Sequence, residues 1–148
     1  CAAGAPEAVT GRIACCVASH RVDGIAVSNT TLSRVGVSGP VARESGGLSG
    51  RPLFERSTRM LAKVYLATGG TIPLVGIGGI DSGASALAKI KAGATLIQLY
   101  TGLVYEGPGL IGRIKRHLVD ATRSARAAAV TELTGIDAEL WASRPLEA

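Results

Sequence analysis

The sequence predicts an α/β fold, and three observations about one stretch lead to that prediction. Residues 72–77 are a short apolar run that ends in two glycines, which is typical of a strand buried on both faces. Small and apolar residues then recur at helical spacing between Ser82 and Gly93. Residues 95–100 form a second apolar run. A strand, a helix and a strand in this order make a βαβ unit, whose parallel strands belong to an α/β sheet.

The part of the chain before this unit predicts a helix, a strand and a loop. Apolar spacing predicts a helix over residues 6–20, and a short apolar run predicts a strand over residues 24–28. A loop rich in glycine and serine then extends from Leu32 to about Arg51. Loops of this length in compact domains are usually lids or binding loops, and simple disorder is the alternative.

A second helix is predicted from Pro52 to about Ala67, where a threonine and two glycines end it. Four of its apolar side chains are expected to point inward: Leu53, Met60, Leu61 and Val64. In the βαβ unit, Ser82 is the expected N-cap. The residues that recur there at helical spacing are Ala84, Leu87, Ala88 and Ile90 to Lys91.

The last part of the chain is predicted to be helical. Pro108 begins a helix that extends to about Val119, and the alanine-rich residues 123–130 are a candidate continuation. A capped turn over residues 131–135 precedes a final helix, in which Trp141 is expected to anchor packing. The expected order is a helix followed by three βα units. A complete (β/α)8 barrel takes roughly 250 residues, so this chain could supply only its last three strands and the helix before them.

Composition limits the class of protein. The chain has 148 residues, 47% of them hydrophobic and 18% charged, which is a globular composition sufficient for one domain. No apolar run is long enough to span a bilayer, and the first residues show no signal peptide. Three cysteines indicate neither a disulfide framework nor a metal site, and a reducing compartment fits best. The net charge is +5, but only 3% of the residues are aromatic, so nucleic acid is not an expected partner.

The ends of the predicted strands carry the candidate binding groups. Asn29 and Thr30 follow the first strand, at the end where α/β folds bind ligands. Gly79 follows the second strand and Thr101 the third, and small residues there leave backbone N–H groups free to approach an anion. Paired loops after the last two strands of a barrel often hold a phosphate.

Four tracts, in this order, carry a resemblance to a known family. They are GIAVSNTT at residues 24–31, SGGLSGRPL at residues 45–53, PLVGIGGIDSG at residues 73–83 and AGATLIQLYTGLVYEGPGLI at residues 92–111. Together they resemble the C-terminal half of dihydroorotate dehydrogenases, and the last tract resembles the class 2, quinone-reducing, membrane-associated branch. Residues 1–148 are therefore expected to be the C-terminal portion of an FMN-binding barrel domain.

The resemblance implies the C-terminal part of a (β/α)8 TIM barrel with FMN at the carboxyl ends of its strands. Such enzymes oxidise dihydroorotate to orotate in pyrimidine biosynthesis, and a quinone reoxidises the flavin. By position, Asn29 and Thr30 match residues that bind the pyrimidine. The residues that match FMN contacts are Ser28, Gly50, Gly79, Tyr100 and Thr101.

The chemistry of these residue types agrees with the implied roles. An asparagine offers a donor and an acceptor to the imide edge of orotate, and glycines let the backbone approach a phosphate. If neighbouring strands bring Gly79 and Thr101 side by side, their N–H groups converge with that of Gly50 on the FMN phosphate. A Cβ at position 79 is then expected to displace the flavin from a folded protein, whereas Gly83 is expected to tolerate alanine.

Several parts of such an enzyme have no counterpart in these 148 residues. The serine base, the asparagines that grip orotate and flavin, and a flavin-contacting lysine are expected in the first half of the barrel. An N-terminal helical pair, also absent, would form the quinone tunnel and the membrane contact. The segment alone is therefore expected to be inactive.

The whole protein is expected at the cytoplasmic face of the bacterial inner membrane, with the mitochondrial inner membrane as the alternative. Two other hypotheses stay open. One is a different FMN- or phosphate-binding barrel enzyme, and the other is a non-catalytic half-barrel.

Overall fold

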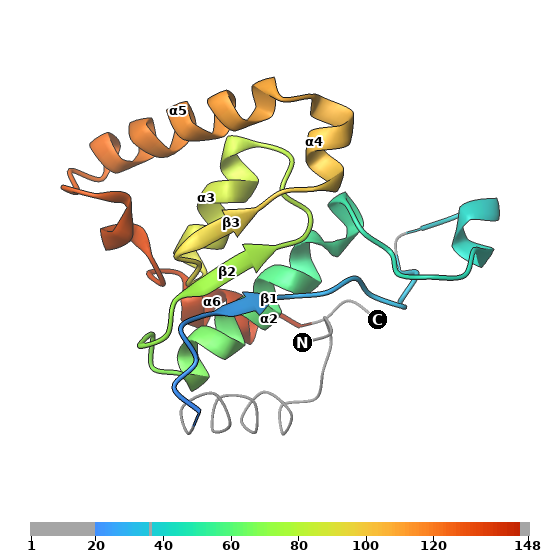
Figure 1. Ribbon diagram of the computed structural model, residues 1–148, viewed down its shortest axis with the longest axis horizontal. Helices are drawn as coiled ribbons and strands as arrows, with labels where there is room; N and C mark the ends of the chain where they lie inside the picture. Colours follow the sequence, from blue (N-terminus) through green and yellow to red (C-terminus); the bar gives the residue numbers. More distant parts are fainter. Residues whose placement is uncertain (1–19, 36, 146–148) are drawn as a thin grey trace.

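The computed structural model describes residues 20–35 and 37–145, so the helix predicted over residues 6–20 lies outside the described part apart from His20 (Figure 1). The predicted α/β class is confirmed. A parallel sheet of three strands forms the centre. Its strands are β1 (Ile25–Val27), β2 (Leu74–Ile77) and β3 (Leu96–Gln98).

The strands lie side by side in the order in which the chain makes them, β1-β2-β3. Val27 is opposite Gly76, which is in turn opposite Ile97, so the three carboxyl ends lie along one edge of the sheet. Sequential parallel strands joined by helices are the arrangement of a (β/α)8 barrel. Within the described residues the sheet is open, with β1 and β3 at its edges, as expected of part of a barrel.

The connecting helices α2 (Phe54–Ala67) and α3 (Gly83–Lys91) cover one face of the sheet, and α6 (Ala138–Ser143) packs against α2 (Figure 1). A short 3₁₀ turn, η2 (Arg51–Leu53), leads into α2. The side chains predicted to point inward are confirmed as buried: Leu53, Met60, Leu61 and Val64. Burying each such side chain contributes about 1.5–3 kcal/mol, so this layer fixes the helices on the sheet.

The buried face of α3 differs from the expected pattern. Ala84 is exposed, although its spacing placed it with the apolar residues. The buried side chains of α3 are Ala86, Lys89 and Ile90. This helix packs against α5 (Gly109–Ser124) as well as against β3 and α2. A helix with several neighbours buries more than one stripe, and a single periodicity cannot identify all of its contacts.

The chain after β3 contains a helix that the sequence did not predict, α4 (Thr101–Glu106). It begins shortly after β3 ends at Gln98, where only a turn was expected. Helix α5 follows Pro108, as predicted, but it ends at Ser124. The predicted alanine-rich continuation is wrong, because Arg126 has a φ of 54°, which is incompatible with a right-handed helix.

The last elements confirm the packing role of Trp141. A 3₁₀ turn, η3 (Val130–Leu133), leads to α6, which carries the tryptophan. Its ring meets that of Phe54 edge to face, with centroids 5.8 Å apart and planes at 88°. Since Phe54 begins α2, this contact joins the end of the described chain to the helix beside the sheet.

Candidate functional site

The carboxyl ends of the strands surround a cavity of about 160 Å³. All seven residues predicted to bind substrate or cofactor line it: Ser28, Asn29, Thr30, Gly50, Gly79, Tyr100 and Thr101. They come from the ends of β1, β2 and β3 and from the loop before α2. A second cavity, of about 540 Å³, shares Gly50, Gly79 and Thr101 with the first. The fold therefore brings the predicted site together.

Asn29 is held by the residue that follows it. Its Oδ1 accepts the Thr30 N–H at 2.8 Å and lies 3.4 Å from the Thr30 hydroxyl. Because Oδ1 is engaged, the Nδ2 hydrogens are the donors that this side chain offers to a ligand. Asn29 and Thr30 are exposed, whereas Ser28 is buried. The carboxamide is thus oriented at the mouth of the site.

The backbone N–H groups of Gly50, Gly79 and Thr101 are candidate donors to a ligand. In residues 20–35 and 37–145, no loop or cap hydrogen bond between backbone groups has the N–H of any of these three as its donor. The hydroxyls of Ser49 and Thr101 are 3.0 Å apart, which ties the loop to the start of α4. Unpaired N–H groups around one cavity are the arrangement with which loops bind phosphate and other oxyanions.

Two of these residues require glycine for different reasons. The φ angles of Gly50 and Gly79 are 75° and 73°, in the region that L side chains avoid. A Cβ on Gly50 would lie 3.1 Å from the movable Cγ2 of Thr101. A Cβ on Gly79 would lie 2.4 Å from the Cα of Phe54, where the backbone leaves no room. The expectation that a side chain at 79 displaces only the ligand is therefore wrong, because it also disrupts packing on α2.

Gly83 is not the tolerant position that was expected. A Cβ there would lie 2.3 Å from the Cβ of His117 on α5. Alanine at 83 would force α3 away from α5, which is overpacking of a helix contact. Gly39 is the better control for a substitution, since it has a φ of 82° and no atom within 4 Å of an added Cβ.

Arg34, which sequence reasoning missed, holds the loop between β1 and α2. Its guanidinium donates to the carbonyl oxygens of Thr31, Leu32, Glu44 and Gly46, at 3.3, 3.3, 3.0 and 2.5 Å. Thr31 and Leu48 also pair in a short antiparallel bridge. The described part of the loop is therefore held in place, which favours the binding loop over disorder. No sequence pattern distinguished Arg34 from Arg43 in the same loop.

Arg34→Met is expected to loosen this loop. Hydrogen bonds from a charged donor contribute about 1.5–3 kcal/mol each when shielded and less when exposed. The fraction of molecules in which the loop is open should therefore increase about tenfold. Limited thermolysin digestion of a full-length protein that contains these residues would measure the opening as faster cleavage within residues 35–48. Arg43→Met, at an exposed position of the same loop, is the control. Equal cleavage rates in the two variants would refute the role of Arg34.

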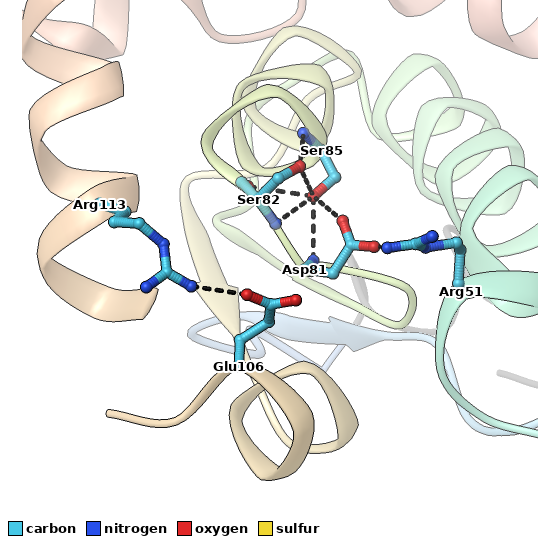
Figure 2. Close-up of polar contacts among 6 residues, drawn as sticks. All are labelled: Arg51, Asp81, Ser82, Ser85, Glu106 and Arg113. Atoms are coloured by element: carbon cyan, nitrogen blue, oxygen red, sulfur yellow. Dashed lines mark hydrogen bonds and ion pairs between the residues drawn. The ribbon is translucent and has the colours of Figure 1, made fainter. Parts of the chain in front are cut away.

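Two ion pairs lie near the larger cavity, which Arg51, Asp81 and Glu106 line (Figure 2). Arg51 Nε is 2.6 Å from Oδ2 of Asp81, and Arg113 is 2.7 Å from Oε2 of Glu106. Partial burial would raise the pKa of Asp81, but hydrogen bonds from Arg51 and Ser82 and the charge of Arg51 outweigh it, so the pKa is lowered. The Arg51 side chain is 80% exposed, and such pairs contribute only about 0–1 kcal/mol. The pair orients the loop before α3 more than it stabilises the fold.

The predicted N-cap of α3 is confirmed, and Figure 2 shows its partners. Ser82 Oγ accepts the Ser85 N–H at 3.2 Å, and Ser85 Oγ accepts the Ser82 N–H at 3.0 Å. Ser85 Oγ also accepts the Asp81 N–H at 3.0 Å. This capping box fixes the turn that follows Gly79.

A buried lysine lies beside the end of β2, and the sequence did not predict it. Lys89 on α3 has no exposed surface, and its Nζ donates to Ser57 Oγ at 2.6 Å and to the Ile77 carbonyl at 3.3 Å. Burial lowers the pKa of Lys89 from 10.5 to about 7. The spacing of Lys89 from Ala86 and Ile90 indicates that the three residues share one face of the helix. A lysine at such a position is usually solvated, so the spacing alone did not predict its burial.

The stability of the folded protein is expected to depend on the protonation of Lys89. Between pH 7 and 10.5 the unfolded chain binds a proton at Lys89 that the folded chain does not, so the free energy of unfolding rises with pH. Lys89→Met should abolish this rise and be more stable than the parent near pH 7. Thermal midpoints of the full-length protein near pH 7 and pH 9.5 measure the effect. Lys91→Met, on the same helix but partly exposed, is the control, and an unchanged slope in Lys89→Met would refute the prediction.

The sheet, the cavity and its donors define a class of protein. A sequential parallel sheet with helices on one face, and a cavity at the carboxyl ends of its strands, is the arrangement of part of an α/β barrel.

The chain belongs to the dihydroorotate dehydrogenase family. The model of the family described as dihydroorotate dehydrogenase matches residues 5–121. This confirms the resemblance carried by the four tracts and decides against an unrelated phosphate-binding barrel.

Similar proteins agree in sequence and in fold. The dihydroorotate dehydrogenases (quinone) of Brucella ovis and Brucella melitensis biotype 2 are each 54% identical over 129 residues, which is 86% of this chain and 35% of the relative. The structure of the Eimeria tenella enzyme in complex with ferulenol superposes with a TM-score of 0.86 at 33% identity, over 92% of this chain and 36% of that one. The ligand-free structure from the same organism gives 0.86 at 32% identity, over 97% and 39%. This chain thus spans about a third of the length of its curated relatives.

Proposed function

We infer that these residues form the C-terminal part of a quinone-dependent dihydroorotate dehydrogenase. Such a protein oxidises dihydroorotate to orotate in pyrimidine biosynthesis, with FMN as its cofactor and a quinone as its electron acceptor. The observation that carries the proposal is that seven residues from four segments of the sequence line one cavity. The Brucella relatives are quinone-dependent dihydroorotate dehydrogenases, which supports the reaction and the acceptor.

The residues present fit the phosphate end of FMN. Three residues whose N–H groups have no loop or cap partner line the cavity, and two of them, Gly50 and Gly79, are glycines in the left-handed region. A cavity of about 160 Å³ is smaller than the roughly 300–1,000 Å³ of sites that enclose a whole ligand. The described residues would therefore hold one end of the cofactor, and other parts of the barrel would hold the rest. When bound, FMN supplies the redox chemistry, because it takes a hydride from the substrate and passes electrons to the quinone.

Side chains of this segment would bind and orient the substrate and the cofactor. Asn29 would donate from Nδ2 to a carbonyl oxygen of the pyrimidine, while its Oδ1 still accepts the hydrogen bond from the Thr30 N–H. The Thr30 hydroxyl would add a second polar contact to the substrate. Ser28 would contact the cofactor from its buried position after β1. These groups bind and orient, and the proton-accepting base is expected elsewhere in the barrel.

The test is made on a full-length protein that contains this segment, either its natural chain or one completed with the remaining part of the Brucella ovis relative. It should purify with about one flavin per chain and should reduce a quinone only when dihydroorotate is present. A protein without flavin and without this activity would refute the proposal.

The segment expressed by itself is expected to turn over no dihydroorotate. Large apolar side chains near the β3 edge of the sheet are exposed in the described chain, among them Leu96 (62%), Val104 (70%) and Tyr105 (84%). Such surfaces favour aggregation or loosely packed states. Activity and thermal unfolding of the purified segment measure this. A sharp cooperative transition together with measurable turnover would favour an autonomous half-barrel instead.

The location of the whole protein remains a proposal. We place it peripherally at the cytoplasmic face of the bacterial inner membrane, which the similarity to bacterial quinone-dependent relatives supports. Among residues 20–35 and 37–145, no helix has the length and apolarity needed to cross a bilayer. Membrane contact is expected through a part of the protein that precedes these residues.

A further inference from the structure

Lys89 occupies an unusual position for a lysine. Its side chain is completely buried, and no carboxylate of the described residues forms an ion pair with it. Lysines are seldom fully buried unless they are paired. An apolar side chain of similar length would fill the space without removing a charge from water, so packing alone does not account for the residue.

The polar contacts of Lys89 lead to the backbone at the end of β2. Nζ donates to the Ile77 carbonyl at 3.3 Å and to Ser57 Oγ at 2.6 Å. Ser57 Oγ is in turn 3.1 Å from the carbonyl oxygens of Gly78 and Phe54, one of which receives its single hydrogen. Lys89 and Ser57 therefore connect α3 and α2 to the last residue of β2 and the first residue of the following turn.

That turn is the part of the cavity wall that contains Gly79. Gly78 and Gly79 both line the cavity, and Gly79 rests directly on Phe54 at the start of α2. The N–H of Gly79 has no loop or cap partner in the described part of the chain. The position of the Gly79 N–H relative to Gly50 and Thr101 therefore depends on the contacts that α2 and α3 make with this turn.

We propose that Lys89 is a positioning residue for the FMN phosphate, which holds the Gly78–Gly79 turn through Ser57 and Ile77 and places a positive charge behind it. The proposal rests on the proposed function, because the phosphate is that of the proposed cofactor. Three groups face Nζ. The Ser57 hydroxyl and the Phe54 ring, whose centroid is 5.3 Å away, belong to α2, and the Ile77 carbonyl belongs to β2. Burial lowers the pKa of Lys89, and none of the ion pairs among the described residues includes it. In a poorly solvated site such a charge acts over a longer range than in water.

The experiment compares two ligands that differ only in the phosphate. Full-length apoprotein is titrated with FMN and with riboflavin, and flavin fluorescence gives both dissociation constants. Lys89→Met should weaken FMN binding about tenfold and riboflavin binding less than twofold. Lys91→Met, a partly exposed lysine of the same helix, is the control and should change neither. Ser57→Ala should weaken FMN several-fold without affecting riboflavin, and it provides the test if Lys89→Met does not fold.

A pH profile separates this role from a merely structural one. The preference of the parent for FMN over riboflavin should fall as the pH rises from about 7 to 9.5, because Lys89 loses its proton, and it should be constant in Lys89→Met. Equal weakening of both ligands, or unchanged FMN binding in both Lys89→Met and Ser57→Ala, would overturn the inference while the proposed function stands. A parent protein that binds neither flavin would overturn the proposed function and the inference with it.

Discussion

A full-length protein that carries Gly50→Val is expected to fold but to purify almost without flavin. Gly50 has φ 75° and ψ −158°, a conformation that is essentially restricted to glycine, so a β-branched residue must change the backbone there. That change would move the N–H group of Gly50, a residue that lines the cavity, and the new Cβ would also crowd the Cγ2 of Thr101 at 3.1 Å. Flavin absorbance per protein should fall to about a tenth or less, with an unchanged far-UV circular dichroism spectrum.

Two further variants make this result specific. Gly39→Val lies in the same loop and has a comparable φ of 82°, but its Cβ would meet no atom within 4 Å, so its flavin content should be that of the parent. Thr101→Val removes the hydroxyl bond to Ser49 and keeps the backbone N–H, so it should lose flavin only a few-fold. Full occupancy in Gly50→Val, or equal loss in Gly39→Val, would show that Gly50 does not bind the phosphate.

Gly79→Val tests the packing of the turn against α2 as well as flavin binding. Its Cβ would meet the Cα of Phe54 at 2.4 Å, so the variant should lose both flavin and thermal stability. This is why the phosphate assignment is better tested at Gly50 than at Gly79. The two glycines look alike in the sequence, since each ends a glycine-rich tract. Only the structure shows that a Cβ would meet a movable side chain at Gly50 and the backbone of α2 at Gly79.

The sequence was informative where structure depends on local pattern. Each strand lies in a short apolar run, and α2 carries one apolar stripe, so their existence and order could be predicted. The gathering of the candidate site residues around one cavity could be predicted because parallel strands end along one edge, whatever the details of packing. Their resemblance to one family then supplied the roles of Asn29 and Thr30.

Features that depend on contacts between distant elements were missed. Lys89 is buried because Ser57 and Ile77 meet it from other elements, and no helical spacing contains that information. Gly83 is intolerant because α5 places His117 against it, more than thirty residues later in the chain. Helix α4 begins without a side-chain cap at a strand end, so no local signal marked its start.

Asn29→Ala is expected to reduce kcat/KM for dihydroorotate about 10- to 100-fold while the flavin content stays that of the parent. Truncation removes the Nδ2 donors and leaves the substrate oxygen unpaired, at about 1–3 kcal/mol in a shielded site. It also removes the acceptor of the Thr30 N–H, a bond of 2.8 Å. Asn29→Asp keeps that acceptor but has no Nδ2, so its loss of activity measures the contribution of the Nδ2 donor with the acceptor still in place.

Asn29→Asp should lose at least as much activity as Asn29→Ala, because dihydroorotate carries a carboxylate and a second negative charge would face it. Steady-state kinetics with a quinone acceptor, beside flavin absorbance, separate substrate binding from cofactor binding. Ser33→Ala, in the loop beyond the cavity, should leave both unchanged. If Asn29→Asp were as active as the parent, the Nδ2 group would not be the donor to the pyrimidine. If flavin were lost in parallel with activity, Asn29 would belong to the cofactor site.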